Sequence, residues 1–294
     1  MRHGTAKCVL RRIPALRLVD LLPALPDNAA VSIDWKQMWR RATVLSNREF
    51  ARGSRWITLR SEDEHPVPYE PGNVLSLRIG EGGERMKHAY TVTWADAAAR
   101  TFSIIYRVIP TGQMTPRLAS LGQEASVEFS GVHHNPIRHE VNPGAAQVVG
   151  LATGTGVGPL YGYFRYVLEN GLEKRPLSLF VGFREEADIG PRAELDALVA
   201  NHPNFRWAPT LSQAEAGWQG LRGRITESVP ELIDRPRETH FHLVGNGAML
   251  VDMEAALARV GVPEAFVSDE TYFNWEAEAS DDVADRIAAR FRLQ

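Results

Sequence analysis

Cysteine is almost absent from this chain of 294 residues, which contains a single one, Cys8. One thiol cannot form an internal disulfide, and it cannot supply the four thiolates that usually hold an iron–sulfur cluster. The chain also lacks an apolar run of membrane-spanning length and an excess of basic residues, since 33 Lys and Arg stand against 36 Asp and Glu. These absences exclude a disulfide scaffold and argue against a membrane span and against nucleic acid as a partner.

The composition is that of a globular protein with a sizeable core, because 44% of the residues are hydrophobic and 23% are charged. We expect it to be cytoplasmic. Residues 1–35 form an extension that is basic and free of acidic residues as far as Val19. We favour an amphipathic extension that packs on the protein, because Pro14 interrupts the pattern and Ser is absent there; an organellar transit peptide is the alternative.

The first half of the chain after this extension has the pattern of short β-strands. From Trp39 to about Phe129, apolar stretches alternate with turn residues such as Pro71-Gly72 and Gly82-Gly83. Several strands at this spacing predict an antiparallel barrel or sandwich, with one short helix. The predicted strands are Arg55–Leu59, Val74–Ile79, Tyr90–Trp94, Phe102–Val108 and Ala125–Phe129, and the helix is Thr115–Leu121.

After Asn142-Pro143-Gly144 strands and helices alternate, which predicts a doubly wound parallel sheet. We therefore predict a two-domain α/β protein: a β-barrel over residues 36–142, an α/β domain over residues 143–275, and a C-terminal helical extension over residues 276–294. The predicted strands are Gln147–Ala152, Leu177–Phe183, Phe205–Thr210, His240–Val244 and a last one near Ala265–Asp269. The predicted helices are Leu160–Asn170, Arg192–Asn201, Ile225–Leu232 and Ala248–Val260.

The stretch Val148–Pro159 (VVGLATGTGVGP) has the pattern of a strand, a glycine turn and a helix. Glycines let the backbone approach a ligand, and a helix N-terminus offers free N–H groups to a phosphate. The segment is neither a mononucleotide P-loop, which needs Lys and Ser or Thr after its last glycine, nor GxGxxG. It is a variant phosphate turn, with a plain strand-to-helix turn as the alternative; its candidate residues are Thr153, Gly154, Thr155, Gly156, Gly158 and Pro159.

Three further segments carry residues suited to binding a flat ring or a phosphate. In His88-Ala89-Tyr90-Thr91 an aromatic ring and a hydroxyl follow each other on a strand, although Tyr and Thr are also common strand residues. Gly112-Gln113-Met114-Thr115 precedes a helix, where Thr as a helix N-cap is the structural alternative. Val244–Met249 (VGNGAM) opens another helix, and its Asn and Gly also suit an ordinary loop.

The order HAYT, GQMT, GTGVGP, VGNGAM resembles the ferredoxin–NADP reductase family from roughly Trp39 to Trp275. Tyr69–Val74 and Val181–Arg184 also resemble segments of that family. The resemblance implies that the barrel binds FAD, with FMN as the alternative, and that the α/β domain binds NADPH, with NADH as the alternative. The implied flavin residues are His88, Ala89, Tyr90, Thr91, Tyr106, Arg107, Gly112, Gln113, Met114 and Thr115. The implied coenzyme residues are Thr153–Gly156, Gly158, Pro159, Arg184, Arg224, Gly245, Asn246 and Met249, and the implied catalytic positions are Tyr90, Thr91, Val244 and Tyr272.

The sequence departs from the family pattern at three places. His88 stands where the family usually has an arginine that pairs with the flavin phosphate, and an imidazole is a weaker phosphate partner. Val244 stands where many members have cysteine. The chain also continues beyond the late aromatic residues Tyr272, Phe273 and Trp275, for which core packing is the alternative to covering the flavin.

The resemblance implies a flavin-dependent oxidoreductase that passes a hydride from NADPH to FAD and then single electrons to a separate carrier. Ferredoxin, flavodoxin or another small carrier is the expected partner, and such carriers are usually acidic. Two alternatives remain: an NADH-dependent reductase component of an oxygenase system, and a degenerate nucleotide-binding electron-transfer or regulatory subunit. Arg184 and Arg224 favour NADPH because they resemble positions that hold its 2′-phosphate, while a basic rim would suit the acidic partner; the rim residues are Arg78, Arg85, Lys87 and Arg117.

Histidines gather at two places, and neither has a familiar metal-ligand spacing. His133, His134 and His139 share one predicted loop, and His240 and His242 share one strand face. We expect no metal site. In the family, the loop after the last barrel strand runs beside the flavin, so His133 and His134 are expected near the cofactor.

Overall fold

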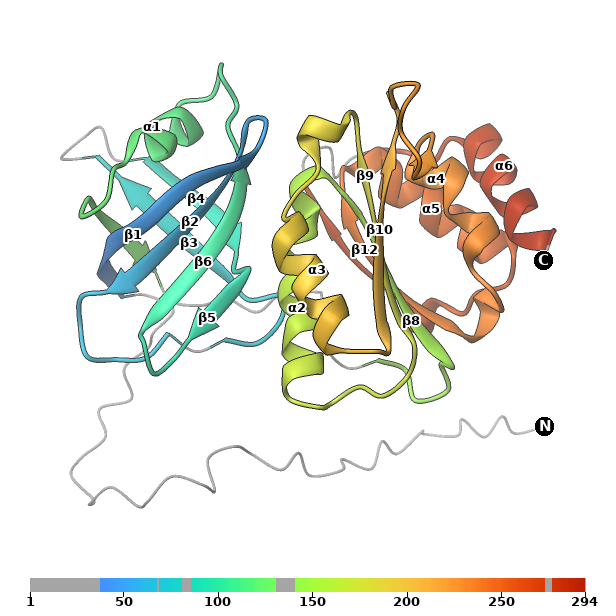
Figure 1. The fold of residues 1–294 in the computed structure, drawn as a ribbon, viewed down its shortest axis with the longest axis horizontal. Coiled ribbons are helices and arrows are strands. Elements are labelled where there is room, and N and C mark those ends of the chain that lie inside the picture. The colour runs from blue at the N-terminus through green and yellow to red at the C-terminus, as the bar shows by residue number, and fades with distance from the viewer. Residues whose placement is uncertain (1–37, 68, 81–85, 131–140, 273–276, 294) are drawn as a thin grey trace, which may run out of the picture. The chain divides into compact units, whose positions relative to one another are not determined.

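The computed structural model describes residues 38–67, 69–80, 86–130, 141–272 and 277–293. These residues form an antiparallel sheet followed by a parallel sheet, which are the left and right halves of Figure 1. Both sheets belong to one unit that spans residues 35–294. None of the described helices is long and apolar enough to cross a bilayer.

The first sheet has seven antiparallel strands in the order β4-β3-β7-β1-β2-β6-β5. The edge strands β4 and β5 are consecutive in the chain, and only Val92 and Thr93 separate them. The sheet therefore curls until its edges meet, which confirms the predicted barrel. Its elements are β1 (Trp39–Ala51), β2 (Ser54–Ser61), β3 (Val74–Ile79), β4 (Met86–Thr91), β5 (Trp94–Asp96), β6 (Thr101–Arg107), helix α1 (Met114–Ser120) and β7 (Ser126–Ser130).

The prediction of one continuous strand over Tyr90–Trp94 is wrong, because the chain changes partner strands within this segment. The N–H of Val92 donates to the carbonyl of Asn73 at 2.7 Å, next to β3. The N–H of Thr93 donates to the carbonyl of Ser103 in β6 at 2.8 Å. The passage from one sheet edge to the other is a tertiary event that a strand pattern does not reveal.

The second sheet has six parallel strands in the order β11-β10-β9-β8-β12-β13. Helices α2 and α3 pack on one face of this sheet, and α4, α5 and α6 pack on the other, which confirms the doubly wound architecture (Figure 1). The strands are β8 (Gln147–Thr153), β9 (Leu177–Phe183), β10 (Phe205–Leu211), β11 (Leu221–Arg222), β12 (Thr239–Gly245) and β13 (Val267–Thr271). The helices are α2 (Val157–Glu169), α3 (Arg192–Asn201), α4 (Ile225–Ser228), α5 (Gly247–Arg259) and α6 (Asp281–Arg292).

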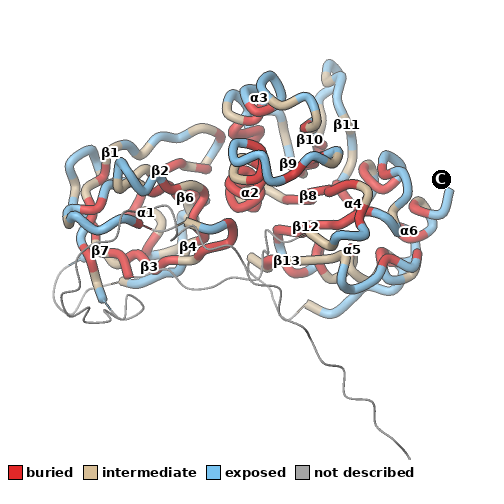
Figure 2. The backbone as a smooth tube through the Cα atoms, turned by 90° about the horizontal axis from the view of Figure 1, so that it is seen from below, coloured by how far each residue is buried: buried red, intermediate tan, exposed pale blue. Residues whose placement is uncertain are grey.

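Helix α2 is buried along most of its length because it lies between the parallel sheet and the barrel (Figure 2). A Cβ atom on Gly162 would lie 2.0 Å from the carbonyl oxygen of Thr93, so only glycine allows this approach of helix and barrel. The helix begins at Val157, three residues before the predicted Leu160. Pro159 is tolerated because the first turn of a helix needs no donor from it.

Helix α6 forms part of the α/β layer. Its apolar face, which includes Ile287 and Phe291, joins the core cluster around α5. Arg259 of α5 pairs with Asp281 and Asp285 of α6, both at 2.7 Å. The helix predicted after residue 276 is thus present and is anchored by apolar and ionic contacts.

Candidate active site

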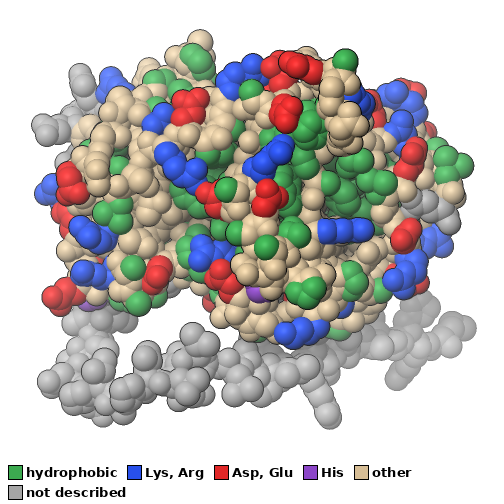
Figure 3. Space-filling view, viewed as in Figure 1, with side chains coloured by type: hydrophobic (Ala, Val, Ile, Leu, Met, Phe, Trp, Pro, Cys, Tyr) green, Lys and Arg blue, Asp and Glu red, His purple; other side chains and the backbone are tan. Residues whose placement is uncertain are grey.

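A cleft of about 580 Å³ lies at the carboxyl ends of the parallel strands. This is the edge where open α/β sheets bind their ligands. In the view of Figure 1, hydrophobic side chains gather in the upper middle of the molecule, with acidic and basic side chains beside them (Figure 3). The parallel sheet and its helices contribute most of the lining, including Thr153, Gly154, Thr155, Arg184, Asp188, Arg224, Gly245, Asn246, Met249 and Asp252, while Phe50, Ser54 and Arg107 come from the barrel.

The predicted phosphate turn divides between the cleft and the core. Thr153, Gly154 and Thr155 line the cleft, and Gly154 has a φ of +54°, which favours glycine. A Cβ atom on Gly156 would lie 2.6 Å from the Val244 carbonyl oxygen. Gly156, Gly158 and Pro159 are buried. The threonine side of the turn therefore faces the cleft, whereas the first residues of α2 are buried.

The turn after β12 lies beside this first turn. A Cβ atom on Gly245 would lie 2.4 Å from the Thr153 hydroxyl oxygen, so glycine permits the two strand ends to meet. The Asn246 side chain accepts a hydrogen bond from the N–H of Met249 at 3.0 Å and caps α5. Gly245, Asn246 and Met249 line the cleft. Val244 is fully buried and is not part of the lining.

Two arginines mark one end of the cleft. Arg184 follows β9 and Arg224 precedes α4, and both side chains are exposed. Both also line a second hollow of about 420 Å³, together with Ser212, Gln213, Gly223 and Glu227. A Glu227 carboxylate oxygen accepts from the Arg224 backbone N–H at 3.0 Å. Two guanidinium groups next to hydroxyl and amide groups form a site suited to a phosphate.

A buried polar contact joins the barrel to the parallel sheet. The Thr91 hydroxyl at the end of β4 donates a hydrogen bond to the Glu270 carboxylate on β13, and both residues are buried. Tyr272 follows two residues later, lines the cleft, and donates its backbone N–H to the Gly245 carbonyl at 2.6 Å. Burial and the neighbouring Glu270 carboxylate raise the pKa of the Tyr272 hydroxyl well above its ordinary value.

Tyr90 is the aromatic residue of β4, and its ring meets that of Tyr106 edge-on at 6.4 Å. The Tyr106 hydroxyl donates to Asn47 Oδ1 at 3.0 Å. The buried Tyr90 hydroxyl has no hydrogen-bond partner in the described part of the chain. Burial raises the pKa of both tyrosines. His88 and Ala89 precede Tyr90 and are exposed, and β4 is an edge strand.

The Gly112–Thr115 segment closes a loop onto α1. Gln113 occupies the N-cap position without a side-chain hydrogen bond, and Met114 is buried. Thr115 Oγ1 accepts from the N–H of Ile109 at 2.8 Å. Thr115 is therefore not a helix N-cap, which was the alternative to a binding role for this residue. Its hydroxyl ties the turn to the end of the preceding strand.

Two domain families match this chain in the order of its two sheets. The oxidoreductase FAD-binding domain matches residues 41–135, and the oxidoreductase NAD-binding domain matches residues 151–255. The chain belongs to the ferredoxin–NADP reductase-like family of flavoproteins. As a member of this family it is an oxidoreductase that acts on NAD(P)H, with FAD and a nicotinamide nucleotide as its cofactors.

Individual relatives differ in electron acceptor. Ferredoxin–NADP reductase B of Sorangium cellulosum is 29% identical over 238 residues, which cover 79% of this chain and 96% of that protein. NADH-cytochrome b5 reductase 1 of Dictyostelium discoideum is 28% identical over 197 residues, covering 66% of this chain and 68% of that protein.

Two solved structures share the fold. The Amycolatopsis cytochrome P450 reductase aligns with a TM-score of 0.69 and 24% identity, covering 80% of this chain and 70% of that one. The ferredoxin NADP+ reductase of Neisseria gonorrhoeae, solved with bound FAD and NADP, aligns with a TM-score of 0.67 and 19% identity, covering 79% of this chain and 98% of that one.

The barrel residues fit a bound flavin of this family. A buried hydroxyl without a partner is costly, and a ligand that brings hydrogen-bonding atoms to Tyr90 would remove that cost. Tyr90 is only partly buried and also supplies aromatic surface for a flat ring, and the buried Tyr106 ring supports it from the core. The residues next to Tyr90 that would hold FAD are Thr91, on the side of Glu270, and His88, on the exposed strand edge.

Several site residues escaped the sequence analysis. Glu270 stands in a strand and belongs to no motif quoted above; its only signal is a carboxylate two positions before Tyr272. Phe50 and Asp188 line the cleft from segments with no binding pattern, and so does Val283 of α6. These residues reach the cleft through tertiary packing.

Of the four residues predicted to form a basic rim, two are exposed and one is paired with a carboxylate. Arg78 makes a two-point contact with Glu128, at 2.7 and 2.8 Å, and lies 4.0 Å from the Trp39 ring centre. Lys87 and Arg117 are exposed. Arg85 lies outside the described residues.

The histidine clusters are of two kinds. His133, His134 and His139 lie outside the described residues, as do Phe273 and Trp275. His240 and His242 are buried, with ring centres 4.6 Å apart. Within the described ranges, no group of three His, Cys, Asp or Glu side chains is arranged to hold a metal ion.

Proposed function

We propose that this protein is an NADPH-dependent flavoprotein reductase that delivers single electrons to a separate small carrier. The observation that carries the choice of coenzyme is the hollow lined by Arg184 and Arg224, which continues the cleft at the ends of β9 and β10. NADPH differs from NADH by a 2′-phosphate, and two guanidinium groups favour that phosphate over a hydroxyl. Neither arginine side chain has a described carboxylate contact that would occupy it.

The flavin supplies the redox chemistry when bound, because FAD accepts a hydride from NADPH and can release electrons one at a time. The chain positions the reactants and excludes water. The turn Thr153–Thr155 would bind the coenzyme pyrophosphate, while Tyr90 would pack against the flavin. The Thr91–Glu270 pair holds a proton between a hydroxyl and a carboxylate beside the cleft. We infer that Glu270, through Thr91 Oγ1, accepts the proton that is left when the two electrons of the hydride leave one at a time; the hydride transfer itself needs no proton.

The electron acceptor is proposed to be an acidic carrier of the ferredoxin or flavodoxin type. The 29% identity to a ferredoxin–NADP reductase across almost the whole of that protein supports this choice. Lys87 on β4 and Arg117 on α1 supply exposed positive charge on the barrel side. Complementary charge would speed the encounter with such a partner.

A visible absorption spectrum of the purified protein, recorded before and after anaerobic addition of NADPH or NADH, tests this proposal. A flavin spectrum that NADPH bleaches at lower concentration than NADH is the expected result. Arg224→Ala should then raise the NADPH concentration needed by about tenfold and leave NADH nearly unaffected. A protein that cannot be loaded with FAD or FMN would refute the reductase proposal and favour the regulatory subunit.

An NADH-dependent reductase for a haem or oxygenase partner is the second candidate. The NADH-cytochrome b5 reductase of Dictyostelium, at 28% identity, favours it. Equal or better bleaching by NADH in the same experiment would select this candidate. Reduction of a ferredoxin compared with cytochrome b5 would then identify the class of acceptor.

A further inference from the structure

The hairpin between β1 and β2 reaches from the barrel to the segment after β9. Arg52 at its tip donates from Nε and Nη2 to the two oxygens of Asp188, both at 3.0 Å, and from Nη1 to Glu185 at 3.0 Å. The Arg52 backbone N–H also donates to the Ala187 carbonyl at 3.2 Å. One guanidinium group of the barrel thus pairs with two carboxylates of the α/β domain.

These carboxylates lie next to the proposed phosphate site. Glu185 directly follows Arg184 in the chain, and Asp188 lines the same cleft as Arg184 and Arg224. The Asp188 side chain is 9% exposed, so water screens its charge poorly. Without Arg52, two negative charges would oppose the two arginines at this end of the cleft.

Glu227, the acidic residue that lines the second hollow, accepts a hydrogen bond from the Arg224 backbone N–H. Its position is therefore set within the α/β domain. Asp188 makes a similar local contact, because its Oδ2 accepts from the Glu185 N–H at 3.2 Å, but Asp188 and Glu185 also pair with a cation from the other domain.

We propose that Arg52 determines specificity for the coenzyme 2′-phosphate, by offsetting one of the two negative charges that Asp188 and Glu185 place beside Arg184. This proposal rests on the proposed function, because it assumes a coenzyme that carries that phosphate. Arg52 acts as a positioning and charge-balancing residue. Coenzyme preference then depends on the barrel as well as on the α/β domain.

The same hairpin offers a matched control. Arg48 pairs with Glu194 of α3, which is also an ion pair between the two domains. Neither Arg48 nor Glu194 lines the cleft or the second hollow. Arg48→Gln therefore removes an interdomain ion pair without altering the charge at the proposed phosphate site.

The test measures the dissociation constants of NADP+ and NAD+ for the oxidised, FAD-loaded protein by difference spectroscopy. The variants are Arg52→Gln, Asp188→Asn, the double variant and Arg48→Gln. Arg52→Gln should weaken NADP+ binding about tenfold, and Asp188→Asn should tighten it about threefold. NAD+ binding should change less than threefold in each, and the double variant should return towards wild type. Raising the salt concentration should shrink both effects.

Opposite changes in NADP+ affinity for Arg52→Gln and Asp188→Asn would show that charge balance is the cause. A purely structural role for the ion pair predicts weaker binding of both nucleotides in both variants. Equal losses for NADP+ and NAD+, or an equal loss in Arg48→Gln, would overturn the proposal. If Arg52→Gln does not retain FAD, Asp188→Asn alone decides through the sign of its effect. A wild-type protein that binds NAD+ as tightly as NADP+ would instead refute the proposed function.

Discussion

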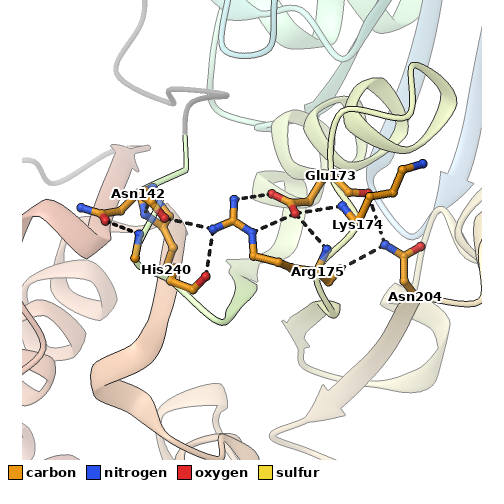
Figure 4. A network of polar contacts seen from close by, with 8 residues as sticks. Asn142, Glu173, Lys174, Arg175, Asn204 and His240 are labelled. Atoms are coloured by element: carbon orange, nitrogen blue, oxygen red, sulfur yellow. Dashed lines mark hydrogen bonds and ion pairs between the residues drawn. The ribbon is translucent and has the colours of Figure 1, made fainter.

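Lowering the pH from 7 to 5 should destabilise the α/β domain, because two histidines of β12, His240 and His242, are buried. His240 Nδ1 accepts a hydrogen bond from the Asn142 backbone N–H at 3.3 Å, and its Nε2 is buried without a partner in the described ranges. Arg175 lies beside this contact and donates to the Asn142 carbonyl at 3.0 Å (Figure 4). Burial, and then the positive charge of Arg175, lower the pKa of His240 from 6.5 to about 4.

The sign of the effect comes from the difference in proton binding. Below about pH 6.5 the unfolded chain protonates His240, whereas the folded protein does not until the pH approaches 4. The contribution to stability is therefore complete above pH 6.5 and declines as the pH falls towards 4. The shift corresponds to a loss of about 2 kcal/mol between pH 7 and pH 5. Burial and the neighbouring His240 also lower the pKa of His242, so it acts in the same direction.

Urea unfolding at pH 7, 6 and 5, followed by far-UV circular dichroism, measures this loss. Glu254 and Asp269 act in the opposite direction, because burial raises the pKa of both carboxyl groups. The comparison of His240→Gln with wild type therefore isolates the histidine, and the variant should lose about 2 kcal/mol less between pH 7 and pH 5.

Tyr163→Phe is the matched control for this experiment. Tyr163 packs against His242 with ring centres 4.3 Å apart, and burial raises the pKa of its hydroxyl far above this pH range. The substitution perturbs the same cluster without removing a group that titrates between pH 5 and pH 7. A wild-type pH dependence in His240→Gln, or its loss in Tyr163→Phe, would refute the reasoning.

Two further predictions concern the reaction and the interface between the domains. Glu270→Gln should slow the passage of single electrons to a one-electron acceptor about 10- to 100-fold in stopped-flow measurements, without slowing hydride uptake or weakening NADP+ binding, because the proton of the hydride must leave at that stage and Glu270 would accept it through Thr91. Glu254→Gln, on α5 outside the cleft lining, should leave the rate unchanged, and equal effects would contradict a role in proton exchange. Gly162→Ala should lower the free energy of unfolding by about 3 kcal/mol, because its Cβ would overlap the Thr93 carbonyl. Gly122→Ala, with nothing within 4 Å, should change it by about 0.5 kcal/mol or less, and similar losses in both would argue against a specific clash.

Much of the architecture was predictable because strand and helix patterns are local properties of a sequence. The predicted bounds of Val74–Ile79, Leu177–Phe183 and Arg192–Asn201 agree with those of β3, β9 and α3. Alternation of strands and helices predicted the parallel sheet, and short strands predicted the barrel. The glycine turn after β8 was recognisable because it needs a residue without a side chain at a defined place.

Only the tertiary structure decided which distant residues share the site. Thr91 and Glu270 are 179 positions apart, and Arg52 and Asp188 are 136 positions apart. No periodicity links such pairs, since their contact depends on how the barrel packs against α2. The sequence alone determined the order of the elements and the turns that can approach a phosphate. Packing of the two domains decided which carboxylates and hydroxyls meet there and which charges remain to receive a ligand, because burial and pairing are properties of the assembled chain.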